Sequence, residues 1–371
     1  MKRYCKEVDI LSGEHLHEAY EAFARGKRSR EEFAAFFEKS EEEVFAKVRS
    51  MVEGRRLDLP EITYFERIEP TNGKRRTIGR ECGMQQFLDY VCVVALEPLF
   101  GAKVGYHQCA SVRGKGQKHA RRYIERWVRN PSMRYYVKID INKYYPNVDR
   151  RALFAMLERD VANEDLVWLV EALVSTHDRG INIGSYLSQF LANYYLSGAF
   201  RYACGLSRER RSRRTGEVSR QKLVDHVLTY MDDWIFVARD KANLKSAVRK
   251  VERYLSKVLS ATIKPWKVRR IDCEPVDMVG YVFRRDRTTI RPAIFLRARR
   301  AIMRANRSRC VLPHQAARVI AYWGYFKVTA CRGFRDKHRL GALVAECRRI
   351  VAACARREMR HAEGPQLGAV A

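Results

Sequence analysis

The sequence has no long hydrophobic run. Its longest apolar stretch, residues 87–100, contains Asp89 and Glu97, and it is shorter than the roughly 20 residues that a membrane-spanning helix needs. The cations near the N-terminus are not followed by an apolar segment, which disfavours a secretory signal. We therefore expect a cytoplasmic protein without a membrane segment.

Cysteine motifs, glycine and proline are also scarce. The ten cysteines include no CxxC pair, and none shares a ligand-like spacing with a histidine, so neither a disulfide framework nor a zinc site is indicated. With 21 Gly, 10 Pro and 46% hydrophobic residues in 371, collagen-like, low-complexity and disordered chains are excluded. The composition is that of a chain that buries a large core.

Acidic residues are few relative to basic ones. The chain has 72 Lys and Arg against 43 Asp and Glu, a formal charge of +29. Residues 1–55 are almost neutral at −1, whereas residues 284–371 carry +16. So uneven an excess calls for a polyanionic partner. Nucleic acid is favoured over a membrane surface, because residues 297–309 are too polar on all sides for a lipid-facing helix.

Hydrophobic patterning predicts strands that alternate with helices. Residues 62–79 contain Asn72-Gly73 between two β-prone runs, the signature of a tight hairpin. Strands are expected at 135–141 and in both halves of 227–239, and no internal repeat is found. The helices are expected within 14–50 and at 83–100, 115–129, 149–159, 164–175, 185–200 and 241–260. This order predicts an α+β fold with helices packed on one face of a sheet.

Three carboxylates fall at the ends of the predicted strands. Asp140 closes the first strand on the face opposite its apolar residues, and Asp232-Asp233 interrupt the later pair of strands. Adjacent aspartates are common in turns, but burial in an apolar context is costly without a cation. Carboxylates delivered to one sheet edge suit two Mg²⁺ ions, with Mn²⁺ as a substitute, because Mg²⁺ combines a few carboxylates with substrate phosphates.

These motifs resemble those of reverse transcriptases. YMDD at 230–233 is similar to the central palm motif of that family, and VKIDINKYYPNVD at 137–149 is similar to the motif with the first catalytic aspartate. Further similar segments follow in the expected order at 75–79, 95–120, 181–193, 263–270 and 278–283. The resemblance implies a right-hand polymerase fold with fingers, a palm whose antiparallel sheet has helices on one face, and a helical thumb.

The resemblance implies five parts of the chain. They are an N-terminal helical extension at 1–55, fingers at 56–130, a palm at 131–285 with fingers-like helices near 160–200, a thumb at 286–358 and a flexible tail at 359–371.

Roles for individual residues also follow from the resemblance. Asp140 and Asp232 would ligate metal ions together with the carbonyl of Ile141, and Asp233 would complete the acidic cluster. Lys267 matches the lysine that protonates departing pyrophosphate, with simple surface solvation as the other interpretation.

The resemblance also assigns the nucleotide contacts. Tyr145 matches the bulky residue that blocks a ribose 2′-hydroxyl, although a core aromatic is the alternative. Either Arg75 or Arg76 would approach the triphosphate of the incoming dNTP. In the thumb, the basic residues along the expected helices would contact the sugar–phosphate backbone, and they include Arg297, Arg300, Arg304 and Arg307.

Residues 183–189 point to a subclass. Ile183-Gly184 and Ser188-Gln189 give the pattern IGxxxSQ, which resembles the reverse transcriptases of diversity-generating retroelements. Such enzymes copy a structured cognate RNA into cDNA with errors at template adenines, and they work with a small basic accessory protein. Ile183, Gly184 and Gln189 would lie beside the incoming nucleotide, where an aliphatic group removes hydrogen bonds that could orient it.

Other assignments remain open. Antiphage defence-associated reverse transcriptases, which make cDNA from a non-coding RNA, share the palm motifs and often carry extensions such as residues 1–55 and the Arg-rich connection at 207–222. Retron enzymes are disfavoured because Val328-Thr329-Ala330 departs from their Val-Thr-Gly, and group II intron proteins because the chain ends near residue 371. A non-catalytic RNA-binding protein of this fold is the alternative from another class.

Overall fold

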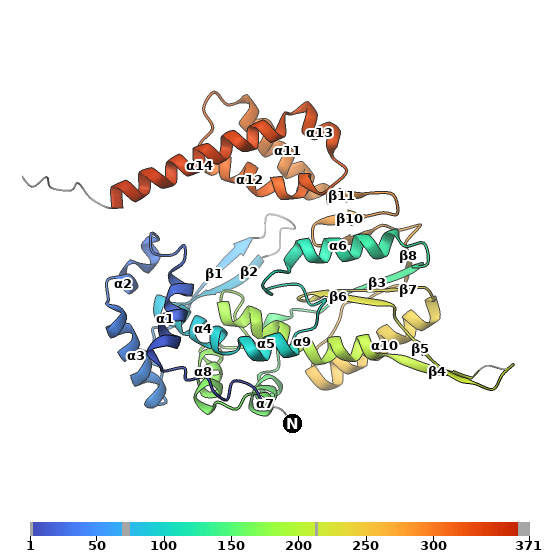
Figure 1. Ribbon diagram of the computed structural model, residues 1–371, viewed down its shortest axis with the longest axis horizontal. Helices are drawn as coiled ribbons and strands as arrows, with labels where there is room; N and C mark the ends of the chain where they lie inside the picture. Colours follow the sequence, from blue (N-terminus) through green and yellow to red (C-terminus); the bar gives the residue numbers. More distant parts are fainter. Residues whose placement is uncertain (1–2, 69–74, 212–213, 363–371) are drawn as a thin grey trace, which may run out of the picture. The chain divides into compact units, whose positions relative to one another are not determined.

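The computed structural model describes residues 3–68, 75–211 and 214–362. The chain divides into two compact units, which are described separately. Unit 1 comprises Met1–Tyr123 and Ser132–Arg270, and unit 2 comprises Ile124–Pro131 and Ile271–Ala371. Figure 1 labels the helices and strands of both.

A four-stranded antiparallel sheet lies at the centre of unit 1, with the order β6-β7-β3-β8. Its strands are β3 (Tyr135–Asp140), β6 (His226–Tyr230), β7 (Asp233–Ala238) and β8 (Arg269–Arg270). The helices α9 (Tyr186–Gly205) and α10 (Lys241–Leu259) pack on one face of this sheet (Figure 1). Val137 and Ile139 belong to the core shared with these helices, so Lys138 and Asp140 point to the opposite face.

Unit 1 has further helices. They are α4 (Gly83–Ala95), α5 (Glu97–Lys103), α7 (Arg150–Asp160), α8 (Glu164–Ser175) and the first part of α6 (Gly116–Arg129), whose remaining residues belong to unit 2. The helix expected over 83–100 is two helices, because Pro98 begins a new first turn after Ala95. A 3-10 turn, η2 (Tyr145–Asn147), follows β3.

The N-terminal segment packs into the core of unit 1. It forms α1 (Gly13–Ala24), η1 (Glu31–Phe33), α2 (Ala34–Phe37) and α3 (Glu41–Glu53). Tyr20 and Phe23 are buried, and their rings lie 5.9 and 6.0 Å from that of Phe87 on α4. The apolar positions of this segment therefore serve the same core as α4.

Two separate hairpins extend from unit 1. The first pairs β1 (Thr63–Ile68) with β2 (Arg75–Arg80) as the sequence predicts, while its expected Asn72-Gly73 turn lies outside the described residues. The second pairs β4 (Ser207–Arg211) with β5 (Val218–Lys222). The second hairpin was not predicted, because its strands have no alternation of apolar and polar residues.

Besides the end of α6, the described residues of unit 2 form a three-stranded sheet and four helices. The strands are β9 (Val276–Met278), β10 (Tyr281–Phe283) and β11 (Thr288–Ile290), and the helices are α11 (Pro292–Arg307), α12 (Pro313–Lys327), α13 (Arg332–Lys337) and α14 (Leu340–Ala362). Ile302, Val319, Phe326 and Val344 are buried in its core. Helix α14 continues four residues into the expected tail at 359–371, and the remainder of that tail lies outside the described residues.

No helix in the described parts of the chain is long and apolar enough to cross a bilayer.

Candidate active site

The turn between β6 and β7 holds Asp232 in an unusual backbone geometry. Tyr230 pairs with Asp233, which leaves Met231 and Asp232 as a two-residue loop. Met231 has φ of +55°, a left-handed conformation that costs a non-glycine residue about 1–2 kcal/mol. The Ile141 N–H donates to the carbonyl of Asp232 at 3.1 Å and ties this turn to the end of β3. Strained backbone of this kind occurs at functional sites, where surrounding structure maintains it.

Asp140, Asp232 and Asp233 converge at this end of the sheet. Asp140 lies directly opposite Asp233 in the β3–β7 pair, and such residues share a face with Cβ atoms about 5 Å apart. Burial, and next the charge of Asp233, raises the pKa of Asp232 to about 6, with a further contribution from Asp140. The three carboxylates thus form a negatively charged cluster on the sheet face that points away from α9 and α10.

Two lysines contact the carboxylates. Lys264 Nζ lies 2.6 Å from Asp140 Oδ1, and Lys138 Nζ lies 3.1 Å from Asp233 Oδ1. The Lys264 N–H also donates to the carbonyl of Asp140 at 2.9 Å. Neither lysine was predicted as a site residue, although Lys138 is two positions before Asp140 and shares its face. Lys267, which was predicted, is exposed three residues beyond Lys264.

The donor set fits hard divalent cations. In the described portion of the chain, no group of three or more His, Cys, Asp or Glu side chains is arranged as a metal cage. Mg²⁺ does not require one, since it binds a few carboxylates and completes its shell with water and substrate phosphates. Asp232 has a raised pKa, and lysine ammonium groups contact Asp140 and Asp233. Both observations indicate that these carboxylates need positive charge nearby.

Tyr145 and Arg76 interact electrostatically with Asp232. Burial, followed by the charge of Asp232, raises the pKa of Tyr145, whereas Arg76 lowers it and also lowers that of Asp232. Arg75, by contrast, is exposed and pairs with Glu66 at 3.5 Å. Of the two arginines that the sequence left undecided, Arg76 is therefore the one whose charge acts on Asp232.

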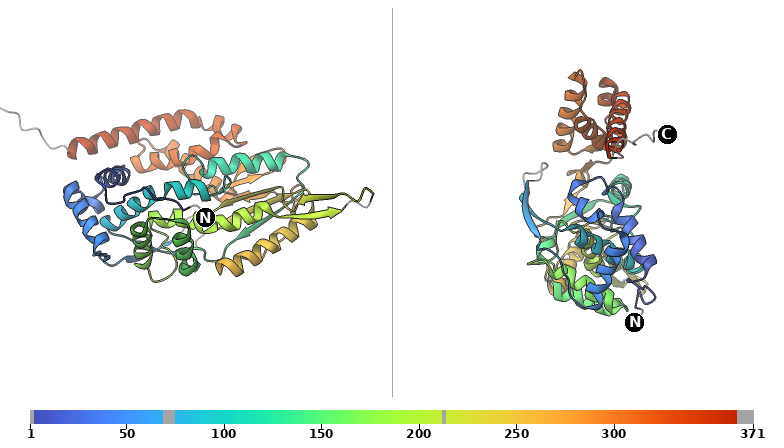
Figure 2. Two further views of the ribbon diagram at one scale, coloured as in Figure 1. Left: turned by 60° about the horizontal axis from the view of Figure 1, so that its bottom comes forward. Right: turned by 90° about the vertical axis from the view of Figure 1, so that its left-hand side faces the viewer.

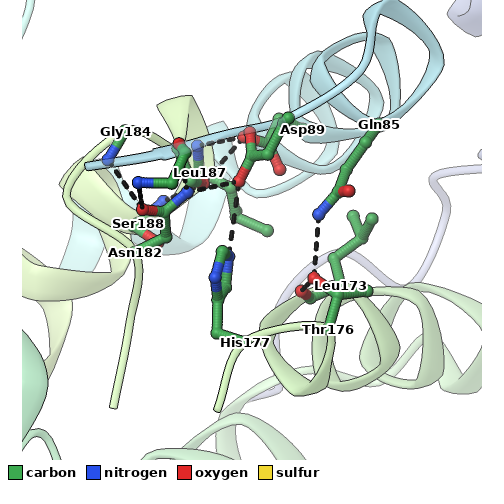
Figure 3. A network of polar contacts seen from close by, with 12 residues as sticks. Gln85, Asp89, Leu173, Thr176, His177, Asn182, Gly184, Leu187 and Ser188 are labelled. Carbon is green, nitrogen blue, oxygen red and sulfur yellow. Dashed lines mark hydrogen bonds and ion pairs between the residues drawn. The ribbon is translucent and has the colours of Figure 1, made fainter. Parts of the chain in front are cut away.

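Asn182 joins the segment 180–189 to the β1–β2 hairpin. Its Oδ1 accepts from the N–H groups of Gly79 at 3.1 Å and Gly184 at 3.0 Å, and its Nδ2 donates to the Gly79 carbonyl at 3.0 Å. Figure 3 shows Asn182 beside Gly184 within a larger polar network. The Ile181 N–H also donates to the carbonyl of Tyr145 at 3.0 Å. The hairpin, residues 180–189 and η2 are thereby held together.

The three residues predicted beside the nucleotide have different surroundings. A Cβ on Gly184 would lie 2.2 Å from the Gly79 carbonyl oxygen, so this position requires glycine for its approach to β2. Gln189 Oε1 accepts from the Ser111 hydroxyl at 3.1 Å. Ile183 is half-buried and precedes the exposed Gly184.

A buried polar network supports the start of α9 (Figure 3). Asp89 Oδ2 accepts from the Ser185 hydroxyl at 2.7 Å and from the Leu187 N–H at 3.1 Å. Burial, and next the neighbouring Glu81, raises the pKa of Asp89 well above its usual range, and burial lowers the pKa of His177 to about 4. His177 Nε2 lies 3.4 Å from Glu81 Oε1. Burial raises the pKa of Glu81 and lowers that of His177, so it disfavours the charged form of both partners in this contact.

The comparison with protein families identifies the group. The description "Reverse transcriptase (RNA-dependent DNA polymerase)" matches residues 68–283, more than half of the chain. The chain belongs to the reverse transcriptase family. The predicted right-hand polymerase fold is confirmed. Reverse transcriptase domains generally use divalent metal ions and bind RNA templates and dNTPs.

Matches to individual proteins are weaker than the match to the family. No curated protein matches the sequence. Among the matching solved structures is apo telomerase from Candida tropicalis truncated from its C-terminal domain, with 11% identity and a TM-score of 0.44. That match covers 62% of this chain and 54% of the telomerase chain, so this reverse transcriptase spans about half the length of that protein.

The thumb cations predicted for this reverse transcriptase lie on α11. Arg297, Arg300, Arg304 and Arg307 recur at helical spacing, and the last three are exposed while Arg297 is half-buried. The buried side of α11 carries other residues, among them Ile302. The four arginines therefore lie on one side of the helix as a basic stripe.

Proposed function

We propose that this chain is an RNA-directed DNA polymerase that makes cDNA from a structured RNA by two-metal phosphoryl transfer. Asp140, Asp232 and the carbonyl of Ile141 hold the metal ions, and Asp233 completes the acidic cluster. The observation that carries this proposal is the convergence of the three carboxylates from β3 and the β6–β7 turn on one face of the sheet. Bound Mg²⁺ or Mn²⁺ ions supply charge stabilisation for the attacking and leaving oxygens.

The remaining residues bind and orient the substrates. Arg76 approaches the triphosphate, which agrees with its electrostatic effect on Asp232. Tyr145 blocks a ribose 2′-hydroxyl and so selects dNTPs. Lys267 gives a proton to departing pyrophosphate, while Lys264 and Lys138 hold the carboxylates until a divalent cation replaces them. Phosphoryl transfer asks little more of a protein than such positioning and charge.

The polymerase domains are proposed as fingers at 56–130, palm at 131–285 and thumb at 286–358, with a helical extension at 1–55. The arginines of α11 contact the backbone of the nucleic acid in this arrangement. The ten free cysteines support a reducing, cytoplasmic location.

Primer extension tests the proposed activity. The unmutated protein is expected to extend a DNA primer on an RNA template in the presence of Mg²⁺, and Asp140→Ala is expected to abolish extension. Glu14→Ala on the first turn of α1 removes a carboxylate far along the chain from the palm and serves as the control. Failure of the unmutated protein to extend any primed RNA would favour a non-catalytic RNA-binding protein of the same fold.

Residues 183–189 support the finer proposal of a diversity-generating retroelement enzyme that is error-prone at template adenines. Ile183 offers no side-chain hydrogen bond at a position next to Gly184 and the hairpin of Arg76. Ile183→Gln is expected to lower misincorporation opposite adenine relative to the other three bases. An unchanged error spectrum would remove this explanation.

The alternative is an antiphage defence enzyme that makes cDNA from a non-coding RNA. Sequencing the copurified RNA and the cDNA made from it separates the two proposals. Substitutions confined to adenines support the retroelement, and repetitive or unmutated cDNA supports the defence enzyme. The retroelement proposal also includes a small basic accessory protein as partner, which copurification tests.

A further inference from the structure

The β4–β5 ribbon has no apolar face that packing would explain. Val218 is its only hydrophobic residue, and it is 62% exposed. An isolated two-stranded hairpin is at best marginally stable in water. This one is held by its backbone ladder and by cross-strand bonds such as those from the Arg208 guanidinium to Gln221 Oε1 at 3.2 and 3.3 Å. The ribbon contributes nothing to a hydrophobic core.

The charge of the ribbon is almost entirely of one sign. Residues 207–222 contain seven Lys and Arg against two Glu. Arg208 and Arg210 point to one face, while Arg211 and Arg220 point to the other. Mixed charges would suffice to protect an exposed sheet edge from aggregation. An excess of one sign on both faces instead favours a polyanionic partner.

A basic and aromatic surface adjoins the base of the ribbon. A pocket of about 380 Å³ is lined by Tyr202 of α9 and by Tyr254, Lys250, Arg253 and Lys257 of α10. The two tyrosine rings stack with centroids 4.8 Å apart. Helix α9 ends three residues after Tyr202, and β4 begins two residues later. Cations interleaved with aromatic rings are typical of RNA-binding surfaces.

This surface lies on the side of the sheet away from the carboxylates. Helices α9 and α10 cover one face, and Asp140 and Asp233 point to the other. Figures 1 and 2 both show β4 and β5 extending outward beyond the ends of these helices. A nucleic acid bound here is therefore separate from the strand that reacts at the carboxylates.

We propose that the β4–β5 ribbon and the adjoining α9–α10 surface bind a helical segment of RNA outside the template–primer site. That the bound nucleic acid is RNA rests on the proposed function. A structured template RNA extends beyond the part that pairs with the primer, and this additional part can bind elsewhere on the protein. The positive charge also repels a basic accessory protein. The contacts are to phosphates and 2′-hydroxyls, because side chains do not read the deep groove of A-form RNA.

The test compares two primed RNAs. One is a short RNA template annealed to a DNA primer, and the other carries an added RNA stem–loop of about 16 base pairs beyond the template. The unmutated protein is expected to bind the second at least about tenfold more tightly, with a steeper salt dependence. The variant R208Q/R210Q/R211Q/R220Q, which removes four ribbon cations, is expected to reduce this gain in affinity from the stem–loop to less than about twofold. The variant K250Q/R253Q/K257Q is expected to reduce the gain in affinity in part.

The control removes the same charge elsewhere. R25Q/R28Q/R30Q/K39Q changes four exposed cations of the N-terminal segment and should keep the full gain. Thermal unfolding shows whether each variant is folded. A folded ribbon variant that keeps the gain overturns the proposal, and an equal gain from a DNA stem–loop overturns the assignment to RNA. Absence of primer extension by every protein would instead refute the proposed function, because the binding measurement does not require catalysis.

Discussion

The ammonium of Lys264 lies 2.6 Å from Asp140 Oδ1. The same lysine donates its backbone N–H to the Asp140 carbonyl at 2.9 Å, so the contact is fixed by the chain as well as by charge. The Lys138 ammonium lies 3.1 Å from Asp233 Oδ1. Each lysine supplies the positive charge that a divalent cation would bring to these carboxylates.

Lys264 is therefore expected to compete with metal ions for Asp140. Lys264→Met should increase the affinity for Mn²⁺ several-fold, because a bound cation no longer displaces an ammonium. Electron paramagnetic resonance of free Mn²⁺ measures this without catalysis. Lys241→Met, an exposed lysine at the start of α10, is the control. Weaker Mn²⁺ binding in Lys264→Met would show that the lysine supports the site.

Asn182 is expected to set the distance between the β1–β2 hairpin and residues 183–184. Asn182→Ala leaves the buried Gly79 N–H and carbonyl without their partner, at about 1–3 kcal/mol for each unsatisfied group. The KM for dNTP should rise about tenfold or more, since the strand of Arg76 loses its fixed position.

The matched control for Asn182 is Asn163→Ala. Asn163 caps α8 by accepting the Leu166 N–H at 2.8 Å, and its loss costs about 1 kcal/mol. Its removal should lower the unfolding temperature and leave the KM for dNTP unchanged. If both variants change KM equally, Asn182 acts only through stability.

The buried His177 is expected to lower the stability of the folded protein at mildly acidic pH. Burial lowers its pKa to about 4 in the folded protein, against about 6.5 when unfolded. The unfolded chain therefore binds the extra proton, and stability is fully present above pH 6.5 and is lost as the pH falls toward 4. The unfolding temperature of His177→Gln should fall less between pH 7 and pH 5 than that of the unmutated protein. His17→Gln, which changes an exposed histidine, should behave as the unmutated protein does.

Tyr145 is expected to exclude ribonucleotides by the bulk of its ring. Tyr145→Val should raise the rate of rNTP relative to dNTP incorporation by about tenfold or more, whereas Tyr145→Phe should keep the discrimination. Single-nucleotide incorporation on one primed RNA gives both rates. If the Val and Phe variants discriminate equally between rNTP and dNTP, Tyr145 only packs beside Tyr144, whose ring lies 5.7 Å away.

Much of the fold was predictable because its elements have regular hydrophobic periods. The alternation in β3 correctly placed Asp140 opposite the apolar face, and the spacing in α10 predicted its buried side. Pro98 also marked the break between α4 and α5, although the pattern was interpreted as one helix. The β4–β5 ribbon lacks such a period, since backbone pairing and polar cross-strand contacts form it.

The contacts of the candidate site depend on distant parts of the chain, and here the sequence was less informative. The Asp140–Lys264 pair requires residues 262–264 to lie beside the end of β3, where the Asn142 N–H donates to the Thr262 carbonyl at 2.8 Å. The buried Asp89 interrupts an apolar run, a signal that was used only to exclude a membrane helix. The preference for Arg76 over Arg75 follows from its electrostatic interaction with Asp232, which is distant in the sequence.

Primer extension by Asp232→Ala, measured together with its affinity for the same primed RNA, tests the central claim most directly. Asp232 lies in the strained turn that the Ile141 N–H holds, and its pKa of about 6 reflects burial first and then the charges of Asp233 and Asp140. Asp232→Ala should lose extension while its RNA affinity stays within about twofold of that of the unmutated protein, since phosphate contacts elsewhere supply the affinity. Extension by Asp232→Ala at the unmutated rate would show that this carboxylate does not take part in catalysis.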